Sequence, residues 1–244
     1  KLHAALREFE AVGIISKCKH QNVKGFFSTL FSVPKRDGRV RVIFNLTDLN
    51  EFIETSHFKM DTIREAITLM QPNWWMASID FSNAYYSVAI HPAHRKFLCF
   101  EWQNASYQIN VLPQGARNAP RDFTKLLKPP FAFLRGKGHI CIGYIDDSLF
   151  LAPDKEGILK AVSDAVRLFD ALGLTINFDK SILTPVQNIE YLGFVLNTID
   201  MSVRLTERKQ SKIADLADSL RSKDLCSILE LAEFIGNVVA ADPG

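Results

Sequence analysis

Two aspartates, Asp146 and Asp147, stand side by side between two apolar runs that are typical of β-strands. Residues 139–145 and 148–152 are rich in Ile, Leu, Tyr and Phe, whereas acidic residues suit the tip of a tight hairpin. At an effective dielectric of about 20, two unit charges ~4 Å apart repel by roughly 4 kcal/mol, so the pair needs a cation, a proton or open solvent. A divalent metal bound through oxygen meets this need, and so does a solvated Asp-Asp turn.

Composition sets wide limits on the class of protein. The chain has 244 residues and is 47% hydrophobic and 23% charged, as globular proteins are. Its apolar runs fall short of the ~18 residues of a membrane helix, so we expect no membrane partner and an intracellular location, cytoplasmic or nuclear. The cysteines lack zinc-ligand spacing. Because the chain starts without methionine and has no signal peptide, we expect a segment of a longer polypeptide.

A basic segment with interleaved aromatic residues lies near the N-terminus. Its cations are Lys17, Lys19, Lys24, Lys35, Arg36, Arg39 and Arg41, and its aromatic residues are Phe26, Phe27 and Phe31. This pattern is typical of surfaces that contact phosphates, but it also suits a strand edge protected by lysines. The net charge of +2 does not distinguish the two readings.

The hydrophobic periodicity predicts mixed helices and strands. We expect helices over residues 2–12, 61–70, 120–128, 158–172, 213–220 and 228–240, with Asp61 capping the second and Pro129-Pro130 ending the third. We expect strands over residues 30–33, 40–45, 75–80, 97–102, 107–112, 139–145, 148–152, 189–196 and 201–205. This order favours the α+β class with a largely antiparallel sheet, and without a clear linker we expect lobes rather than independent domains.

A third acid, Asp80, ends the strand expected over residues 75–80. A hairpin bearing Asp146 and Asp147 would pair against this strand and bring three carboxylates together. Three such acids can hold two divalent ions about 3.5–4 Å apart, the arrangement used for nucleotidyl transfer. A three-carboxylate nuclease of the ribonuclease H type is an alternative, although such enzymes rarely draw two ligands from adjacent positions at a hairpin tip.

Six sequence blocks resemble reverse transcriptases in order and spacing. They are Pro34-Lys35-Arg36-Asp37-Gly38 through Leu49-Asn50, the run from Ile79 to Val88, the run from Leu112 to Pro120, Tyr144-Ile145-Asp146-Asp147, the run from Leu172 to Lys180, and Tyr191-Leu192-Gly193-Phe194. The resemblance implies a right-hand polymerase fold. Its fingers would span residues 1–54 and 88–118, and its palm, an antiparallel sheet plus helices, residues 55–87 and 119–200. The start of a thumb would span residues 201–244.

The resemblance also implies an activity, RNA-directed DNA polymerisation. Such an enzyme adds deoxynucleotides to a primer 3′ end on an RNA or DNA template, using two Mg2+ ions that Mn2+ can replace. Residues 123–129 and 191–194 are most similar to retrotransposon enzymes of the long-terminal-repeat and tyrosine-recombinase (DIRS-like) types, which implies fusion to a ribonuclease H domain and other element domains. The alternative is a catalytically inactive, polymerase-derived module that binds nucleic acid.

Individual residues acquire expected roles from the same resemblance. The metal ligands would be Asp80, the Phe81 carbonyl, Asp146 and Asp147, and Lys180 would be a general acid. The nucleotide would contact Lys35, Arg41, Asn83, Ala84, Gln114 and Tyr85, whose ring would exclude a ribose 2′-hydroxyl. The primer would contact Tyr144, Tyr191, Leu192 and Gly193. Two alternatives remain: Tyr85 is a packed aromatic residue, and Lys35 and Arg41 are solvated charges of the hairpin.

Overall fold

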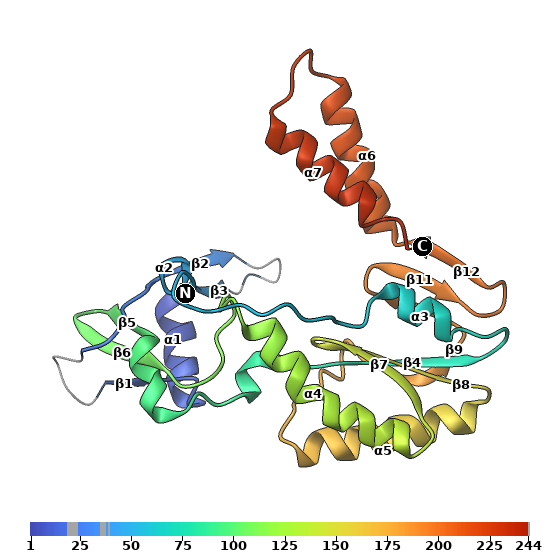
Figure 1. Ribbon diagram of the computed structural model, residues 1–244, viewed down its shortest axis with the longest axis horizontal. Coiled ribbons are helices and arrows are strands. Elements are labelled where there is room, and N and C mark those ends of the chain that lie inside the picture. The colour runs from blue at the N-terminus through green and yellow to red at the C-terminus, as the bar shows by residue number, and fades with distance from the viewer. Residues whose placement is uncertain (19–23, 35–37, 39, 244) are drawn as a thin grey trace. The chain divides into compact units, whose positions relative to one another are not determined.

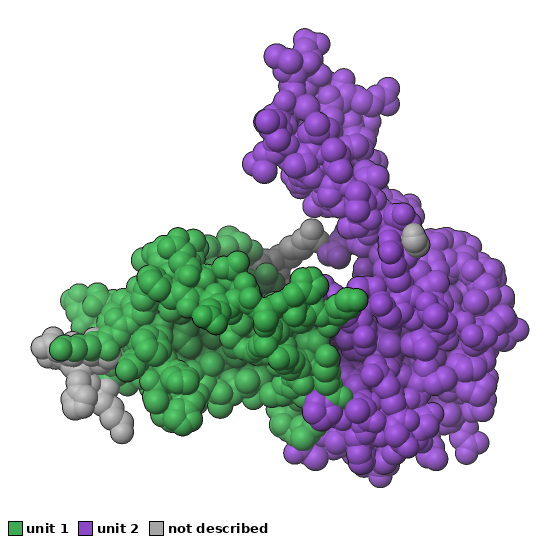
Figure 2. All heavy atoms as spheres, viewed as in Figure 1, with its two compact units in different colours: residues 1–59, 82–128, 172–175 green, residues 60–81, 129–171, 176–244 purple. Residues whose placement is uncertain are grey.

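The computed structural model describes residues 1–18, 24–34, 38 and 40–243 (Figure 1). The chain divides into two compact units, which Figure 2 colours separately. Unit 1 consists of Lys1–Lys59, Ser82–Lys128 and Leu172–Thr175, and unit 2 of Met60–Phe81, Pro129–Ala171 and Ile176–Gly244. Each unit therefore combines stretches that are distant in the sequence.

Unit 1 contains small antiparallel sheets and short helices. One sheet has the order β1 (Ile15–Lys17), β6 (Ala105–Ile109) and β5 (Cys99–Trp102), and β2 (Thr29–Pro34) pairs with β3 (Val40–Asn45). Its helices are α1 (Leu2–Ala11), α2 (Thr47–Asn50), the 3-10 helices η1 (Ala84–Ser87) and η2 (Pro92–Phe97), and the first part of α4 (Ala119–Gly136). Phe44 and Phe100 are almost fully buried, with ring centroids 5.3 Å apart, and mark its core.

Unit 2 is built on an antiparallel sheet. The strand order is β7 (Ile140–Tyr144), β8 (Asp147–Ala152), β4 (Trp75–Asp80) and β9 (Ile182–Val186). The helix α5 (Lys155–Ala171) packs on this sheet, and a buried cluster joins its β4, β7 and β8 side chains to α3 (Ile63–Leu69) and a second sheet. The second sheet is formed by β10 (Asn188–Tyr191), β11 (Phe194–Asn197) and β12 (Ser202–Leu205), and α6 (Glu207–Arg221) and α7 (Ile228–Val239) follow it.

The helix α4 continues through Pro129 and Pro130, so the prediction that these prolines end it was wrong. A proline inside a helix costs about 3 kcal/mol because it lacks the N–H and its ring crowds the preceding turn. One side of α4 carries the buried residues Phe123, Leu127, Phe131 and Leu134, each 4% exposed or less. Phe131 and Leu134 lie beyond the prolines, and burying such a side chain contributes roughly 1.5–3 kcal/mol, so this burial offsets much of the loss.

Two further predictions differ from the structure in detail. The strand expected over residues 189–196 is two strands, because Leu192 and Gly193 have positive φ angles of 50° and 78° and form a tight hairpin turn. Thr62 rather than Asp61 caps α3, in a capping box with Glu65.

The named strands pair antiparallel with one another, and the mixture of helices and strands confirms the α+β class.

Within the described ranges, no helix has both the length and the apolar character needed to cross a membrane.

Candidate active site

The structure brings Asp80 and Asp147 together as cross-strand partners. Asp80 is the last residue of β4 and Asp147 the first of β8, and the two are opposite in the antiparallel register. Tyr144, the last residue of β7, is opposite Asp147 on the other side. Because directly opposite residues share a face of the sheet, the three side chains form a row across its end. The predicted pairing of the acidic hairpin with the Asp80 strand is therefore confirmed.

Asp146 lies in the turn between β7 and β8, beside the residue Ile145. Ile145 has a φ of 53°, which is rare for a β-branched residue and costs on the order of 1–3 kcal/mol. The Phe81 N–H donates to the Asp146 carbonyl at 2.9 Å, so the turn is attached to the residue that follows Asp80. The Asp146 side chain is exposed. The turn thus presents a third carboxylate to solvent close to the other two.

The backbone of Asp80 is held from both sides by the segment before β9. The Asp80 N–H donates to Ser181 Oγ at 3.0 Å, and the Asn177 N–H donates to the Asp80 carbonyl at 2.8 Å. Ser181 Oγ donates in turn to the Asn177 carbonyl at 2.7 Å. No role was predicted for either residue, although Asn177 lies within the matching block from Leu172 to Lys180 and Ser181 directly follows it. They fix the end of β4 where Asp80 is presented.

The acidic cluster carries more negative charge than its surroundings compensate. Burial raises the pKa of Asp147 to about 6, and the charges of Asp146 and Asp80 add to the rise, while Lys180 opposes it. Burial also raises the pKa of Asp80, against the effect of Lys180. Lys180 Nζ is 3.8 Å from Asp80 Oδ2, but the lysine side chain is 68% exposed, so solvent weakens this pair. A cation bound among the carboxylates would relieve the imbalance.

The donors at this site match a hard divalent cation in chemical type. Carboxylate oxygens from Asp80, Asp146 and Asp147, together with a main-chain carbonyl such as that of Phe81, are the ligands that Mg2+ and similar ions take. Among the described residues, no group of three or more His, Cys, Asp or Glu side chains is already arranged as a metal site. The fit to such ions rests on the chemistry of the donor atoms.

In the segment from Tyr191 to Gly193, the turn is partly exposed to solvent and the aromatic ring is buried. Tyr191 is 3% exposed within the buried cluster of unit 2, and its hydroxyl has no hydrogen-bond partner in the described part of the chain. Burial raises the pKa of Tyr191, and the nearby charge of Asp147 raises it further. The Tyr191 ring thus packs in the core of unit 2 and supports the turn that follows it. A primer contact in this segment would fall to the half-buried residues Leu192 and Gly193.

Most of the expected nucleotide-contacting residues lie in unit 1. The ring of Tyr85 in η1 is half-buried and packs edge-on against Phe123, with ring centroids 5.4 Å apart. Asn83 before it is exposed in a left-handed conformation, and Ala84 is 7% exposed. Arg41 is exposed on β3, and its charge opposes the rise in the pKa of Tyr86 that burial causes. Lys35 lies outside the described residues.

The loop that carries Gln114 is held by a side chain that the sequence analysis did not single out. Asn50 Nδ2 donates to the Gly115 carbonyl at 2.9 Å, and Asn50 Oδ1 accepts from the Arg117 N–H at 2.9 Å. Gly115 has a φ of 99°, which suits glycine. Gln114 itself is exposed. The sequence signal was the Leu49-Asn50 pair within the first matching block, but its partner lies 65 residues away.

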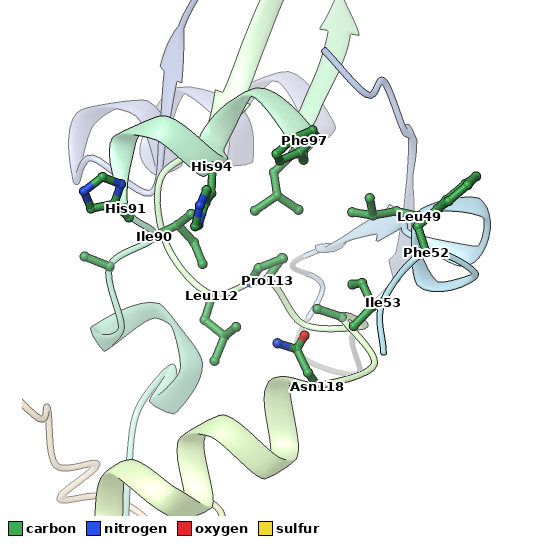
Figure 3. A pocket seen from close by; sticks show the side chains of 13 residues that line it. Leu49, Phe52, Ile53, Ile90, His91, His94, Phe97, Leu112, Pro113 and Asn118 are labelled. Atoms are coloured by element: carbon green, nitrogen blue, oxygen red, sulfur yellow. The ribbon is translucent and has the colours of Figure 1, made fainter. Parts of the chain in front are cut away.

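The same loop borders an apolar cavity of about 510 Å³ within unit 1. Figure 3 shows Leu112 and Pro113 on one side of it and Phe97 and His94 on the helix η2. Leu49 lines it from α2, next to Asn50. Leu112, Pro113 and Ala116 of the loop are buried beside this cavity, and the Asn50 hydrogen bonds hold the backbone on either side of Ala116.

Comparison with known proteins gives consistent relatives. The chain is 27% identical over 203 residues to the enzymatic polyprotein of Soybean chlorotic mottle virus, covering 82% of this chain and 29% of the relative. It is 26% identical to the Gag-Pol polyprotein of Avian reticuloendotheliosis virus, over 80% of this chain and 17% of the relative. It is 21% identical to the transposon Tf2-3 polyprotein of Schizosaccharomyces pombe, over 93% of this chain and 16% of the relative. The chain thus spans less than a third of these relatives.

Solved structures and a family model agree on the fold. The foamy viral protease-reverse transcriptase in complex with double-stranded DNA matches with a TM-score of 0.79 and 20% identity, over 97% of this chain and 39% of that chain. The same kind of protein in complex with an RNA/DNA hybrid matches with a TM-score of 0.72 and 19% identity, over 97% and 30%. The expected right-hand polymerase fold is therefore confirmed. A family model described as reverse transcriptase (RNA-dependent DNA polymerase) matches residues 33–196, more than half of the chain, so the chain belongs to this family.

Proposed function

We propose that this chain is the polymerase part of a retrotransposon reverse transcriptase, an RNA-directed DNA polymerase that extends a primer with deoxynucleotides. The observation that carries the proposal is the cross-strand pairing of Asp80 with Asp147, beside Asp146 in an exposed turn. These acids lie inside the region that the family model matches. A sheet end with three carboxylates that Lys180 compensates only in part is suited to nucleotidyl transfer.

The proposed substrates and partners follow from the relatives. Related solved proteins bind double-stranded DNA or an RNA/DNA hybrid, and we propose a primed RNA or DNA template for this chain. The sequence relatives are viral and transposon polyproteins, which supports fusion to further domains. We propose that a ribonuclease H domain is among them. Within the chain we propose fingers over residues 1–54 and 88–118, palm over residues 55–87 and 119–200, and the start of a thumb over residues 201–244.

Metal binding is proposed for the acidic cluster. Members of this family use divalent metal ions, and we propose two Mg2+ ions, replaceable by Mn2+, held by Asp80, Asp146, Asp147 and the Phe81 carbonyl. When bound, such ions lower the pKa of an attacking hydroxyl and neutralise charge on the triphosphate. The raised pKa values of Asp80 and Asp147 support the proposal, because a cation would stabilise their charged forms.

The protein's own groups have separate proposed tasks. Lys180, near Asp80, would hold a proton for the leaving pyrophosphate. Lys35, Arg41, Asn83, Ala84 and Gln114 would bind the incoming nucleotide, and the Tyr85 ring, packed on Phe123, would exclude a 2′-hydroxyl. Tyr144, Leu192 and Gly193 would contact the primer, with Tyr191 supporting their turn from the core.

Single-nucleotide primer extension tests this function. The chain should add one deoxynucleotide to a DNA primer on an RNA template in the presence of Mg2+, a reaction that needs no processive movement. Asp146→Asn should lower the rate by at least about 100-fold, because a ligand charge is lost. Asp170→Asn, an exposed change on α5, is the matched control and should retain the wild-type rate.

The primer-extension assay also separates the proposed function from the catalytically inactive alternative. A module that only binds nucleic acid would retain a primed template in a gel-shift assay and extend it with neither Mg2+ nor Mn2+. Equal extension by the wild type and by Asp146→Asn would refute the proposed site while leaving the family membership untouched.

A further inference from the structure

The Leu192-Gly193 turn is covered by the first turn of the following helix, α6. Lys209 Nζ donates to the Leu192 carbonyl at 3.2 Å, and the Thr206 N–H donates to the Gly193 carbonyl at 3.3 Å. Thr206 Oγ1 also accepts from the Lys209 N–H at 3.4 Å, as a helix N-cap does. Both carbonyls of the turn are thus held from one helix end.

Lys209 makes two more contacts at the same place. Its ammonium lies 4.1 Å from the ring centroid of Phe194, the first residue of β11, within the range of a favourable cation–π contact. A Cβ placed on Gly193 would lie 2.5 Å from Lys209 Cε, so the lysine stem occupies the space that the missing side chain leaves. The lysine is half-buried, and burial lowers its pKa.

This arrangement differs from that of a lysine placed for solubility. Lys212, one helical turn later, is 54% exposed and pairs with the equally exposed Glu233 of α7 at 3.5 Å. Exposed pairs of that kind contribute little to stability, because solvent screens them. Lys209 is instead partly desolvated. Its ammonium contacts the Leu192 carbonyl in the strained two-residue turn and the Phe194 ring that follows the turn. Its contacts constrain the turn and have no equivalent in Lys212.

We propose that Lys209 is a positioning residue, which fixes the Leu192-Gly193 turn so that it presents a constant surface to the primer strand. The inference rests on the proposed function, in which this turn contacts the primer. It assigns Lys209 no direct contact with a phosphate, since its ammonium is directed to Leu192 and Phe194. Through Lys209 the position of α6 is coupled to the position of the primer.

The test compares Lys209→Met with Lys209→Arg and with the control Lys212→Met. Methionine keeps an apolar stem over Gly193 but loses the ammonium, whereas arginine keeps a cation and a donor. Lys209→Met should weaken binding of a primed template about five- to tenfold, and Lys209→Arg should restore most of this affinity. Lys212→Met should stay within about twofold of the wild type.

Three readouts separate positioning from other roles. Binding of an unprimed single-stranded template should not change in Lys209→Met, because it does not use the primer turn, whereas a general folding defect would lower both affinities. The salt dependence of primed-template binding should keep its slope, whereas a lost phosphate contact would reduce it by about one. The KM for the nucleotide should also stay constant.

Equal primed-template affinity of Lys209→Met and the wild type would overturn the inference, as would an equal loss in Lys212→Met. Binding is measured without nucleotides, so this failure is distinct from failure of the proposed polymerase activity. If the wild type extends a primer and Lys209→Met binds and extends it as well as the wild type does, only the role proposed for Lys209 is refuted.

Discussion

Asp147 is a carboxyl group held in a place that disfavours its charge. Its pKa rises from 3.8 to about 6, first through burial and then through the charges of Asp146 and Asp80. In the metal-free protein the folded state therefore binds this proton more tightly than the unfolded chain does. The stability that the protonated group contributes is fully present below about pH 4 and is lost as the pH rises through 6.

Asp147→Asn tests this linkage. In EDTA at pH 7.5 the variant should be more stable than the wild type by about 1–2 kcal/mol, less than the full shift of about two pKa units implies, because the group is partly solvated. The difference should vanish towards pH 4, and millimolar Mg2+ should stabilise the wild type but not the variant. Urea unfolding at both pH values measures this, with Asp170→Asn as the control. A pH-independent difference would contradict the argument.

At the scale of elements, the loop between β6 and α4 depends on one side chain from α2. Asn50 bonds the Gly115 carbonyl and the Arg117 N–H, and the apolar cavity borders the loop at Leu112 and Pro113. Removing a side chain that satisfies two backbone groups costs about 1–3 kcal/mol. The loop carries Gln114, so the loosening should appear where a nucleotide would bind.

Asn50→Ala should therefore raise the KM for the incoming nucleotide about fivefold, with a smaller effect on kcat and on primed-template affinity. Steady-state single-nucleotide incorporation measures the three quantities. Asn237→Ala, whose amide bonds the Glu233 carbonyl within its own helix, serves as the control. A change in kcat without a change in KM would show that Asn50 does not act through this loop.

Elements with a strong local pattern were predicted from the sequence, and those decided by distant contacts were not. The strand before Asp80 and the two strands around Asp146 lie where alternation and turn residues placed them. The α4 helix passes two prolines because its buried face is favoured by tertiary packing, which no local pattern records. Likewise Asn50 and Ser181 act on backbone groups 65 and 101 residues away, so their roles become visible only in the fold.

At the scale of the whole molecule, α6 and α7 lie outside the buried core of unit 2. Neither helix contributes a buried residue, and Leu225, Ile228 and Leu229 in and before α7 are 79–90% exposed. The pair holds together through its own contacts, including the Lys212–Glu233 ion pair. Thr206 and Lys209 link it to the rest of unit 2 through their hydrogen bonds with the Leu192-Gly193 turn.

Shortening the chain should therefore separate stability from primer binding. A chain of residues 1–206 should unfold cooperatively within a few degrees of the 244-residue chain, because the cores are intact. It should bind a primed template at least about tenfold more weakly, since α6 and Lys209 are gone. A chain of residues 1–222 keeps Lys209 and should bind with intermediate affinity. Circular dichroism and fluorescence anisotropy measure the two properties, and equal affinity of the two shortened chains would contradict the role given to α6.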